Sequence, residues 1–128
     1  MARLLLIDTD HEFLQRCQSI FMDAGHEVVT ADGHSALDEF THFKPDAIIL
    51  EIDLGDVNGL DVMAKILGKN RRVVCLLNPR HDAYRDHFLT WAADGYALKS
   101  PDLHEFAAWV ECILSERGVV HEPECVGV

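Results

Sequence analysis

The fold is decided by the stretch PDAIILEIDLGDVNGL, residues 45–60. Within it, the unbroken apolar run of residues 47–50 ends abruptly at the carboxylate of Glu51. A continuous apolar run of this kind is typical of a strand that is buried on both faces of a parallel sheet. Open sheets of this type keep their sites outside the carboxyl ends of their strands. We therefore expect Glu51 to stand at the edge of a crevice.

The rest of the chain alternates between short apolar runs and amphipathic stretches. The expected strands are residues 3–7, 27–31, 47–52, 72–77 and 95–98. The expected helices are residues 11–24, 34–43, 60–67, 82–93 and 101–116, where apolar residues recur at helical spacing. This alternation predicts parallel strands with right-handed crossovers. The predicted fold class is α/β, a three-layer doubly wound (βα)5 sandwich of the flavodoxin-like type, with a parallel five-stranded sheet in the order 2-1-3-4-5.

Local signals indicate where several helices begin and end. Asp10 is placed to cap the first helix, and Asp82 to cap the fourth. Ser100 as N-cap, with Pro101 at the first helical position, is expected to start the last helix. Residues 119–128 have no pattern, and we expect them to form a mobile C-terminal tail.

Composition narrows the class of function. A chain of 128 residues is one domain by size, and its net charge of −11 argues against partners that are nucleic acids or anionic lipids. No apolar run is long enough to span a membrane, so a cytoplasmic location is expected. The cysteines form no CxxC pair, which disfavours a zinc site, and Cys17, Cys75 and Cys112 fit apolar core patterns. The eight histidines are scattered, and most are expected at the surface.

The predicted strand order brings polar residues from two strand ends into one crevice. Asp8, Thr9 and Asp10 follow the first strand, and Glu51 and Asp53 follow the third. Converging carboxylates are the ligands that Mg²⁺ prefers, so Asp8 and Glu51 are the candidate metal ligands. A flavin or nucleotide would instead need free backbone amides in a loop without acidic residues. The acidic loop after the first strand therefore disfavours a flavin-binding electron carrier, although that alternative stays open.

Three segments in this order resemble the receiver domain of two-component response regulators. They are LLLIDTD at residues 4–10, PDAIILEIDLGDVNGLDV at 45–62 and GYALKSP at 95–101. The resemblance covers residues 3–117, which implies a receiver-like domain at residues 1–118. It also implies a mechanism in which acidic residues hold Mg²⁺ and an aspartate accepts a phosphoryl group from a histidine kinase. A hydroxyl residue and a lysine then bind the phosphoryl oxygens.

The chain departs from that family pattern at most of its chemical positions. By resemblance, Asp8 and Lys99 keep the first acid and the lysine. Thr9 stands in place of the second, metal-binding acid, Glu51 in place of the acceptor aspartate, and Asn78 in place of the hydroxyl residue.

Smaller departures surround these positions. Tyr96 keeps the aromatic residue that changes rotamer on activation, but Ser100 separates Lys99 from Pro101 where the family has a Lys-Pro pair. Pro79 follows Asn78 where a small residue is usual.

These departures favour a pseudo-receiver, a signalling module with a degenerate phosphorylation site. Glu51 is one methylene longer than aspartate, so its carboxylate is expected to reach the phosphoryl position and to pair with Lys99. It would then carry a charge of about −1 where a phosphoryl group carries about −2. We expect no enzymatic activity beyond vestigial autophosphorylation, no cofactor, and at most weak Mg²⁺ binding. Two alternatives stay open: a purely structural Glu51–Lys99 pair, and phosphorylation of Glu51 or Asp53.

Partners are expected to be proteins. The resemblance implies an output surface over residues 82–116, which here contains Trp91, Tyr96 and Trp109. Aromatic side chains are favoured in protein interfaces, although at least one of the two tryptophans is expected in the core. The expected partners are a histidine kinase or an output protein, and a homodimer through the same surface is a further option.

Overall fold

The computed structural model describes residues 1–119 and contains one parallel sheet of five strands. The strands are β1 Arg3–Ile7, β2 Glu27–Ala31, β3 Ala47–Leu50, β4 Val74–Leu77 and β5 Gly95–Tyr96. Their order is β2-β1-β3-β4-β5, which confirms the predicted fold class. The helices are α1 His11–Asp23, α2 Ala36–Phe43, α3 Gly59–Lys69 and α4 Leu103–Glu116, with short 3₁₀ segments η1 Asp82–Tyr84 and η2 Phe88–Ala92.

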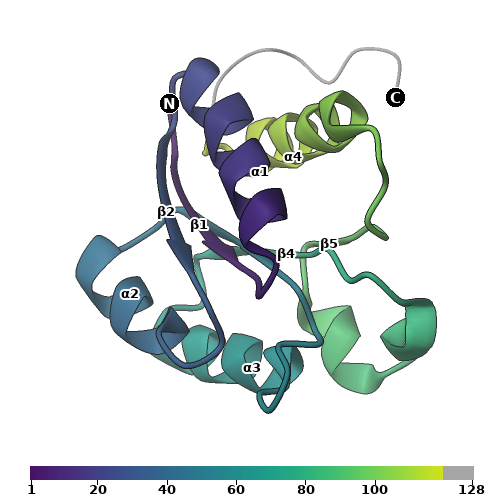
Figure 1. Cartoon of the computed structure of the whole chain (residues 1–128). Coiled ribbons are helices and arrows are strands. Elements are labelled where there is room, and N and C mark those ends of the chain that lie inside the picture. Colours follow the sequence, from purple (N-terminus) through teal and green to yellow (C-terminus); the bar gives the residue numbers. More distant parts are fainter. Residues whose placement is uncertain (120–128) are drawn as a thin grey trace.

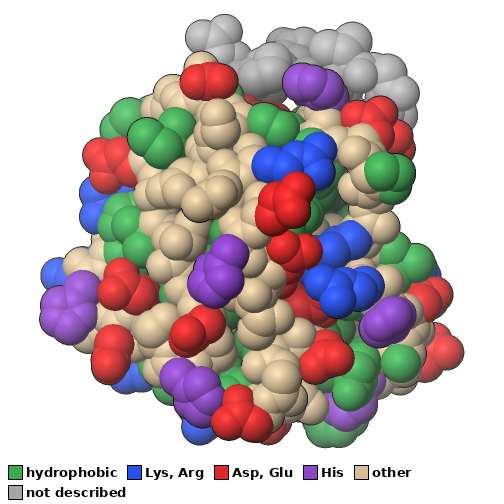
Figure 2. Space-filling model, in the orientation of Figure 1, with side chains coloured by type: hydrophobic (Ala, Val, Ile, Leu, Met, Phe, Trp, Pro, Cys, Tyr) green, Lys and Arg blue, Asp and Glu red, His purple; other side chains and the backbone are tan. Residues whose placement is uncertain are grey.

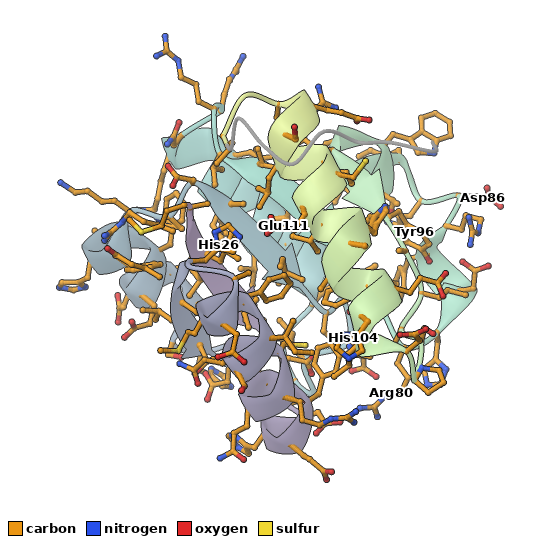
Figure 3. The ribbon with its side chains drawn as sticks, turned by 90° about the horizontal axis from the view of Figure 1, so that it is seen from above. His26, Arg80, Asp86, Tyr96, His104 and Glu111 are labelled. Atoms are coloured by element: carbon orange, nitrogen blue, oxygen red, sulfur yellow. The ribbon has the colours of Figure 1, made fainter. Side chains whose placement is uncertain are left out.

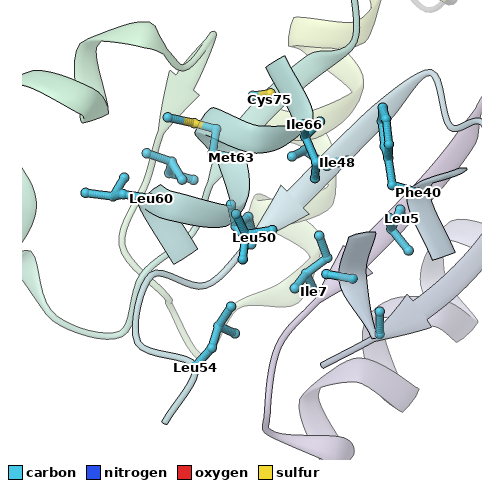
Figure 4. Packing of buried hydrophobic residues seen from close by; sticks show 14 of the residues in the cluster. Leu5, Ile7, Phe40, Ile48, Leu50, Leu54, Leu60, Met63, Ile66 and Cys75 are labelled. Atoms are coloured by element: carbon cyan, nitrogen blue, oxygen red, sulfur yellow. The ribbon is translucent and has the colours of Figure 1, made fainter. Parts of the chain in front are cut away.

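Helices cover both faces of the sheet, with α1 and α4 on one side and α2 and α3 on the other (Figure 1). Successive side chains of a strand point to opposite faces of the sheet, so β1 contributes side chains to both cores. Leu4 and Leu6 pack beneath α1 and α4, whereas Leu5 and Ile7 pack beneath α2 and α3. Figure 4 shows the second of these cores, where β3 contributes two further side chains. The sheet lies between these two buried layers, and the carboxyl ends of its parallel strands meet at one end of it.

The predicted helix at residues 82–93 is wrong. This segment forms η1 and η2 instead of one α-helix. Its polar side chains bond locally: the Thr90 hydroxyl donates to the Tyr84 carbonyl at 2.7 Å, and His87 Nδ1 accepts the Leu89 N–H at 3.1 Å. Such bonds compete with a regular helical ladder. They leave Phe88 and Trp91 with most of their surface exposed.

The start of the last helix also differs from the prediction. Asp102, not Ser100, is the N-cap of α4, and its carboxylate accepts the backbone N–H groups of His104 and Glu105. A carboxylate satisfies two free amides here and also suits the positive end of the helix dipole. Asp10 caps α1 as predicted, by accepting the N–H of Phe13 at 3.1 Å.

Other expectations have mixed outcomes. Cys17 and Cys75 are buried, as predicted, and Cys112 is half-buried. Most described histidines are exposed, as predicted, but His26 is buried, with Nδ1 accepting the Ala2 N–H at 2.8 Å and Nε2 facing Glu111 (Figure 3). Among residues 1–119, no helix is both long enough and apolar enough to cross a membrane. The predicted tail lies outside the described residues except for Val119, whose N–H donates to the Leu114 carbonyl.

Gly59 makes the closest backbone approach near the site, and we predict that Gly59→Ala strongly destabilises the fold. A Cβ there would lie 2.2 Å from the Glu51 carbonyl oxygen and 2.8 Å from the Ile52 Cα. Overpacking against backbone costs roughly 1–3 kcal/mol or more in the free energy of unfolding. Urea denaturation measures the loss.

Gly68 in the same helix provides the matched control. A Cβ there meets nothing within 4 Å, so Gly68→Ala should stabilise the protein by roughly 0.5–1 kcal/mol. Equal effects of the two substitutions would contradict the close approach at Gly59.

Candidate functional site

The carboxylate of Glu51 lies just past β3 and is almost fully enclosed, with the residue only 3% exposed. The Glu51 Oε2 atom accepts the backbone N–H groups of Ile52 at 2.7 Å and Asp53 at 3.1 Å. Glu51 Oε1 accepts the backbone N–H of Arg80 at 3.1 Å. Successive backbone N–H groups that point into one concavity form an anion-binding nest. The side chain of Glu51 therefore fills an anion site built by the two loops that flank it.

Lys99 supplies the positive charge of this site. Its Nζ lies 2.7 Å from Glu51 Oε1 and 2.8 Å from Asp8 Oδ2, and it donates to the Asn78 carbonyl at 3.0 Å. An ammonium group has three N–H donors, so these three acceptors use all of them. The Phe13 ring covers the same ammonium, with 4.8 Å between Nζ and the ring centroid. Lys99 thus ties β1, β3 and β4 together at their carboxyl ends.

Asp8 is the second buried carboxylate, and it is bound on both sides. While Oδ2 faces Lys99, Oδ1 accepts the backbone N–H groups of Thr9 at 2.8 Å and Asp10 at 3.0 Å. The site therefore holds two carboxylates and one ammonium, and backbone N–H groups stabilise the excess negative charge. Figure 2 shows acidic and basic side chains gathered side by side on this face of the molecule.

Asn78 has a different role from the hydroxyl residue that it replaces. Its side-chain amide donates to the Ala97 carbonyl at 2.8 Å. The backbone carbonyl of Asn78 accepts a hydrogen bond from the Lys99 ammonium. Asn78 therefore fixes the position of β5 and Lys99 and does not contact the Glu51 carboxylate with its side chain.

The donor set does not fit a Mg²⁺ site. Every carboxylate oxygen of Asp8 and Glu51 already accepts a backbone N–H or faces Lys99. Thr9 is exposed and carries no charge, and Asp53 is exposed, with Oδ1 accepting the Gly55 N–H. Among residues 1–119, no three His, Cys, Asp or Glu side chains are grouped closely enough to hold a metal ion. Mg²⁺ demands several oxygen ligands in near-octahedral geometry. The carboxylates could supply these ligands only if Lys99 released them.

Tyr96 is in contact with the η1 region. Its hydroxyl donates to Asp82 Oδ1 at 2.8 Å, and the Arg85 guanidinium lies over its ring at 5.0 Å from the centroid. Arg85 also donates to Asp82, at 2.8 and 2.9 Å. Partial burial, together with the hydrogen bond and the charge of Asp82, raises the pKa of Tyr96 to about 12. Asp82 and Arg85 therefore hold the ring in one orientation.

The two candidate interface tryptophans have different environments. Trp91 is 76% exposed on η2, beside the exposed ring of Phe88. Trp109 is half-buried on α4 and packs against the core, with its ring 6.0 Å from that of Phe106. Trp109 is thus the core tryptophan expected from the sequence, and Trp91 is available at the surface. Figure 3 shows Tyr96 on the same side of the molecule as Asp86.

Several contacts of the site had no sequence signal. The amides of Ile52, Asp53 and Arg80 bind Glu51, but every residue other than proline carries such an amide. The Asp8–Lys99 pair was missed because Asp8 was assigned to a metal. The spacing of Asp82 and Arg85, three residues apart, was a usable signal for the pair that holds Tyr96.

Comparison with known proteins identifies the family. Residues 4–111 match the response regulator receiver domain. The chain belongs to this family. The transcriptional regulatory protein PrrA of Mycobacterium tuberculosis is 34% identical over 119 residues, covering 91% of this chain and 51% of PrrA. The receiver chain thus spans about half the length of the curated relatives that it matches.

Solved structures of receivers resemble this fold closely. The response regulator TrrA of Thermotoga maritima, in complex with Mg²⁺-BeF, is 30% identical with a TM-score of 0.79, covering 86% of this chain and 96% of TrrA. TrrA in complex with the histidine kinase ThkA gives 30% identity and a TM-score of 0.80, covering 90% of this chain and all of the matched chain. A CheY-like receiver of Methanospirillum hungatei is 18% identical with a TM-score of 0.85, covering 93% of this chain and 98% of that one, and shows the shared fold.

Removing the site's only ammonium should destabilise the fold severely. We predict that Lys99→Met lowers the free energy of unfolding by about 3–5 kcal/mol, because Asp8 and Glu51 stay buried without a counter-charge. Denaturant unfolding at neutral pH measures this. The control is Arg117→Met, which breaks the more exposed pair with Asp94 and should cost roughly 1 kcal/mol or less. Equal costs would contradict a buried charge centre.

The hydroxyl of Tyr96 should ionise far above the usual range. We predict a pKa of about 12 in an ultraviolet titration, and a lower value in Asp82→Asn, which removes the neighbouring negative charge. Tyr84 supplies the second tyrosine signal, which Tyr84→Phe removes. A Tyr96 pKa that Asp82→Asn leaves unchanged would contradict the contact between them.

Proposed function

We propose that this receiver is a signalling module in which Glu51 acts as a fixed anion instead of a phosphoryl acceptor. The carrying observation is that the Glu51 carboxylate accepts three backbone N–H groups and the Lys99 ammonium. A phosphoryl group on an aspartate at this position would need the same donors. The extra methylene of glutamate lets the carboxylate itself take them, with a charge of about −1 instead of about −2.

The same arrangement supports a receiver that works without metal or catalysis. Phosphoryl transfer to a carboxylate needs cations to neutralise the developing charge, and the one cation in contact with Glu51 is committed to two carboxylates. Glu51 is also a poor nucleophile, because four donors hold its lone pairs. We propose that the chain has no enzymatic activity and needs no cofactor.

The proposed output is through protein contacts in the cytoplasm. TrrA has been crystallised with a histidine kinase, so a histidine kinase or a downstream output protein is the proposed partner class. The proposed contact surface lies over residues 82–116, where Trp91 and Phe88 are exposed. A homodimer through the same surface is part of this proposal. The net charge of −11 opposes contact with nucleic acid or anionic membranes.

A second candidate is a receiver that is phosphorylated on an unusual carboxylate. The observation that favours it is the likeness to TrrA, whose structure contains Mg²⁺-BeF. Glu51 is the first candidate acceptor and Asp53, which is exposed, is the second. This function would require Lys99 to release Asp8 so that a metal could bind.

One measurement separates the two functions. The protein is treated with Mg²⁺ and acetyl phosphate, and its intact mass is recorded. We predict no stoichiometric gain of a phosphoryl group. The matched variant Thr9→Asp/Glu51→Asp, which restores both missing aspartates, tests whether the remaining site accepts one under the same conditions. A gain of one phosphoryl group by the unmodified chain, abolished by Glu51→Ala or Asp53→Ala, would overturn the proposal.

A further inference from the structure

Basic side chains gather at one place in this acidic protein. Residues 62–81 contain five lysines and arginines but no aspartate or glutamate. Four of them, Lys65, Lys69, Arg71 and Arg72, are exposed at the end of α3 and in the turn after it. None of these four forms an ion pair within residues 1–119, although the chain has twice as many acidic as basic residues.

Helix stability alone does not account for this cluster. A basic residue in the last turn of a helix is favoured by the helix dipole, and Lys69 has that position. Arg71 and Arg72 lie beyond the end of α3, where the dipole effect has faded. Their exposed guanidinium groups are therefore available to an anion.

A pocket of about 390 Å³ opens beside this cluster, between the carboxyl ends of α2 and α3. It is lined by Phe40, Thr41, Lys44, Pro45, Lys69 and Asn70. Phe40 and Pro45 are buried and form an apolar floor, whereas the lysines and polar residues are exposed around it. Small-molecule sites commonly combine an apolar lining with a few polar groups in a volume of roughly 300–1,000 Å³.

Lys44 reaches this pocket through an uncommon backbone conformation. It is the C-cap of α2, with φ 53° and ψ 63°, and is the one non-glycine residue among the described ones with a positive φ. Glycine or asparagine is preferred at such a position. Lysine there places a second cation at the pocket besides Lys69, and it forms no ion pair within residues 1–119. The nearby carboxylate of Asp46 accepts the Arg3 N–H at 2.8 Å.

We propose that this pocket, the α2–α3 pocket, binds a small anion with an apolar body. The apolar body would contact Phe40 and Pro45, and the anionic head would lie against Lys44 and Lys69. Arg71 and Arg72 would add long-range attraction. Residues that line the pocket come just before β3 and just after α3, whereas Glu51 comes just after β3. The pocket therefore lies at the opposite end of the sheet from Glu51. This proposal therefore does not depend on the role proposed for Glu51.

The test uses phenylphosphonate as the probe, with ¹⁵N-labelled full chain and two-dimensional NMR. We expect saturable shifts at residues 40–44 and 66–72, with a Kd below about 1 mM. Inorganic phosphate supplies the head alone and phenol the body alone, and each should bind at least about tenfold more weakly than phenylphosphonate.

Charge variants locate the site. Lys69→Glu should weaken phenylphosphonate binding by roughly tenfold, since it reverses a charge at the head group. Arg16→Glu is the matched control, because Arg16 is an exposed cation on α1 without an ion pair in the described chain. This variant should bind phenylphosphonate as tightly as the unmodified protein does.

Three outcomes would overturn the proposal. They are no saturable shift with phenylphosphonate, equal binding of inorganic phosphate, and shifts that map to the exposed rings of Phe88 and Trp91. The acetyl phosphate measurement does not involve this pocket, so either proposal can fail alone.

Discussion

The structure depends on one ammonium group, that of Lys99, which holds two buried carboxylates at the ends of two neighbouring strands. A buried ion pair adds little net stability, but removing one partner lowers the free energy of unfolding strongly, because the other charge stays buried without a partner. Lys99 and the surrounding backbone amides offset the cost of removing the Asp8 and Glu51 carboxylates from water. The loops after β1, β3 and β4 are consequently fixed relative to one another.

This constraint explains why the departures from the family pattern belong together. Glutamate at position 51 is long enough to reach the amide of Arg80, and Pro79 has no N–H to offer before it. Thr9 removes a carboxylate that would have added a third negative charge around one lysine. Asn78 stands at the position of the family's hydroxyl residue and donates to the Ala97 carbonyl. Each change makes sense once Glu51 is itself the occupant of the anion site.

Sequence pattern predicted the architecture because burial controls it. The apolar run before Glu51 and the alternation of strands and helices predicted the sheet order, and that order brought Asp8, Glu51 and Lys99 to one edge. The helix predicted at residues 82–93 failed because apolar periodicity does not report local bonds such as Thr90 to Tyr84. The backbone N–H groups that bind Glu51 could not be predicted from the sequence either, because every residue except proline has such a group.

The segment that failed as a helix begins two residues after Arg80 and carries the exposed rings of Phe88 and Trp91. The backbone of Arg80 contacts Glu51, Asp82 two residues later holds Tyr96, and Trp91 follows on η2. A regular helix would have one stable arrangement, whereas short 3₁₀ turns held by side-chain bonds have less stability of their own. In the proposed function, a change in the position of the Glu51 carboxylate would act on this segment through the backbone of Arg80. In the proposed function, a partner that binds the exposed rings of Phe88 and Trp91 would act on this same segment, and its contact would set the conformation that phosphorylation sets in other receivers.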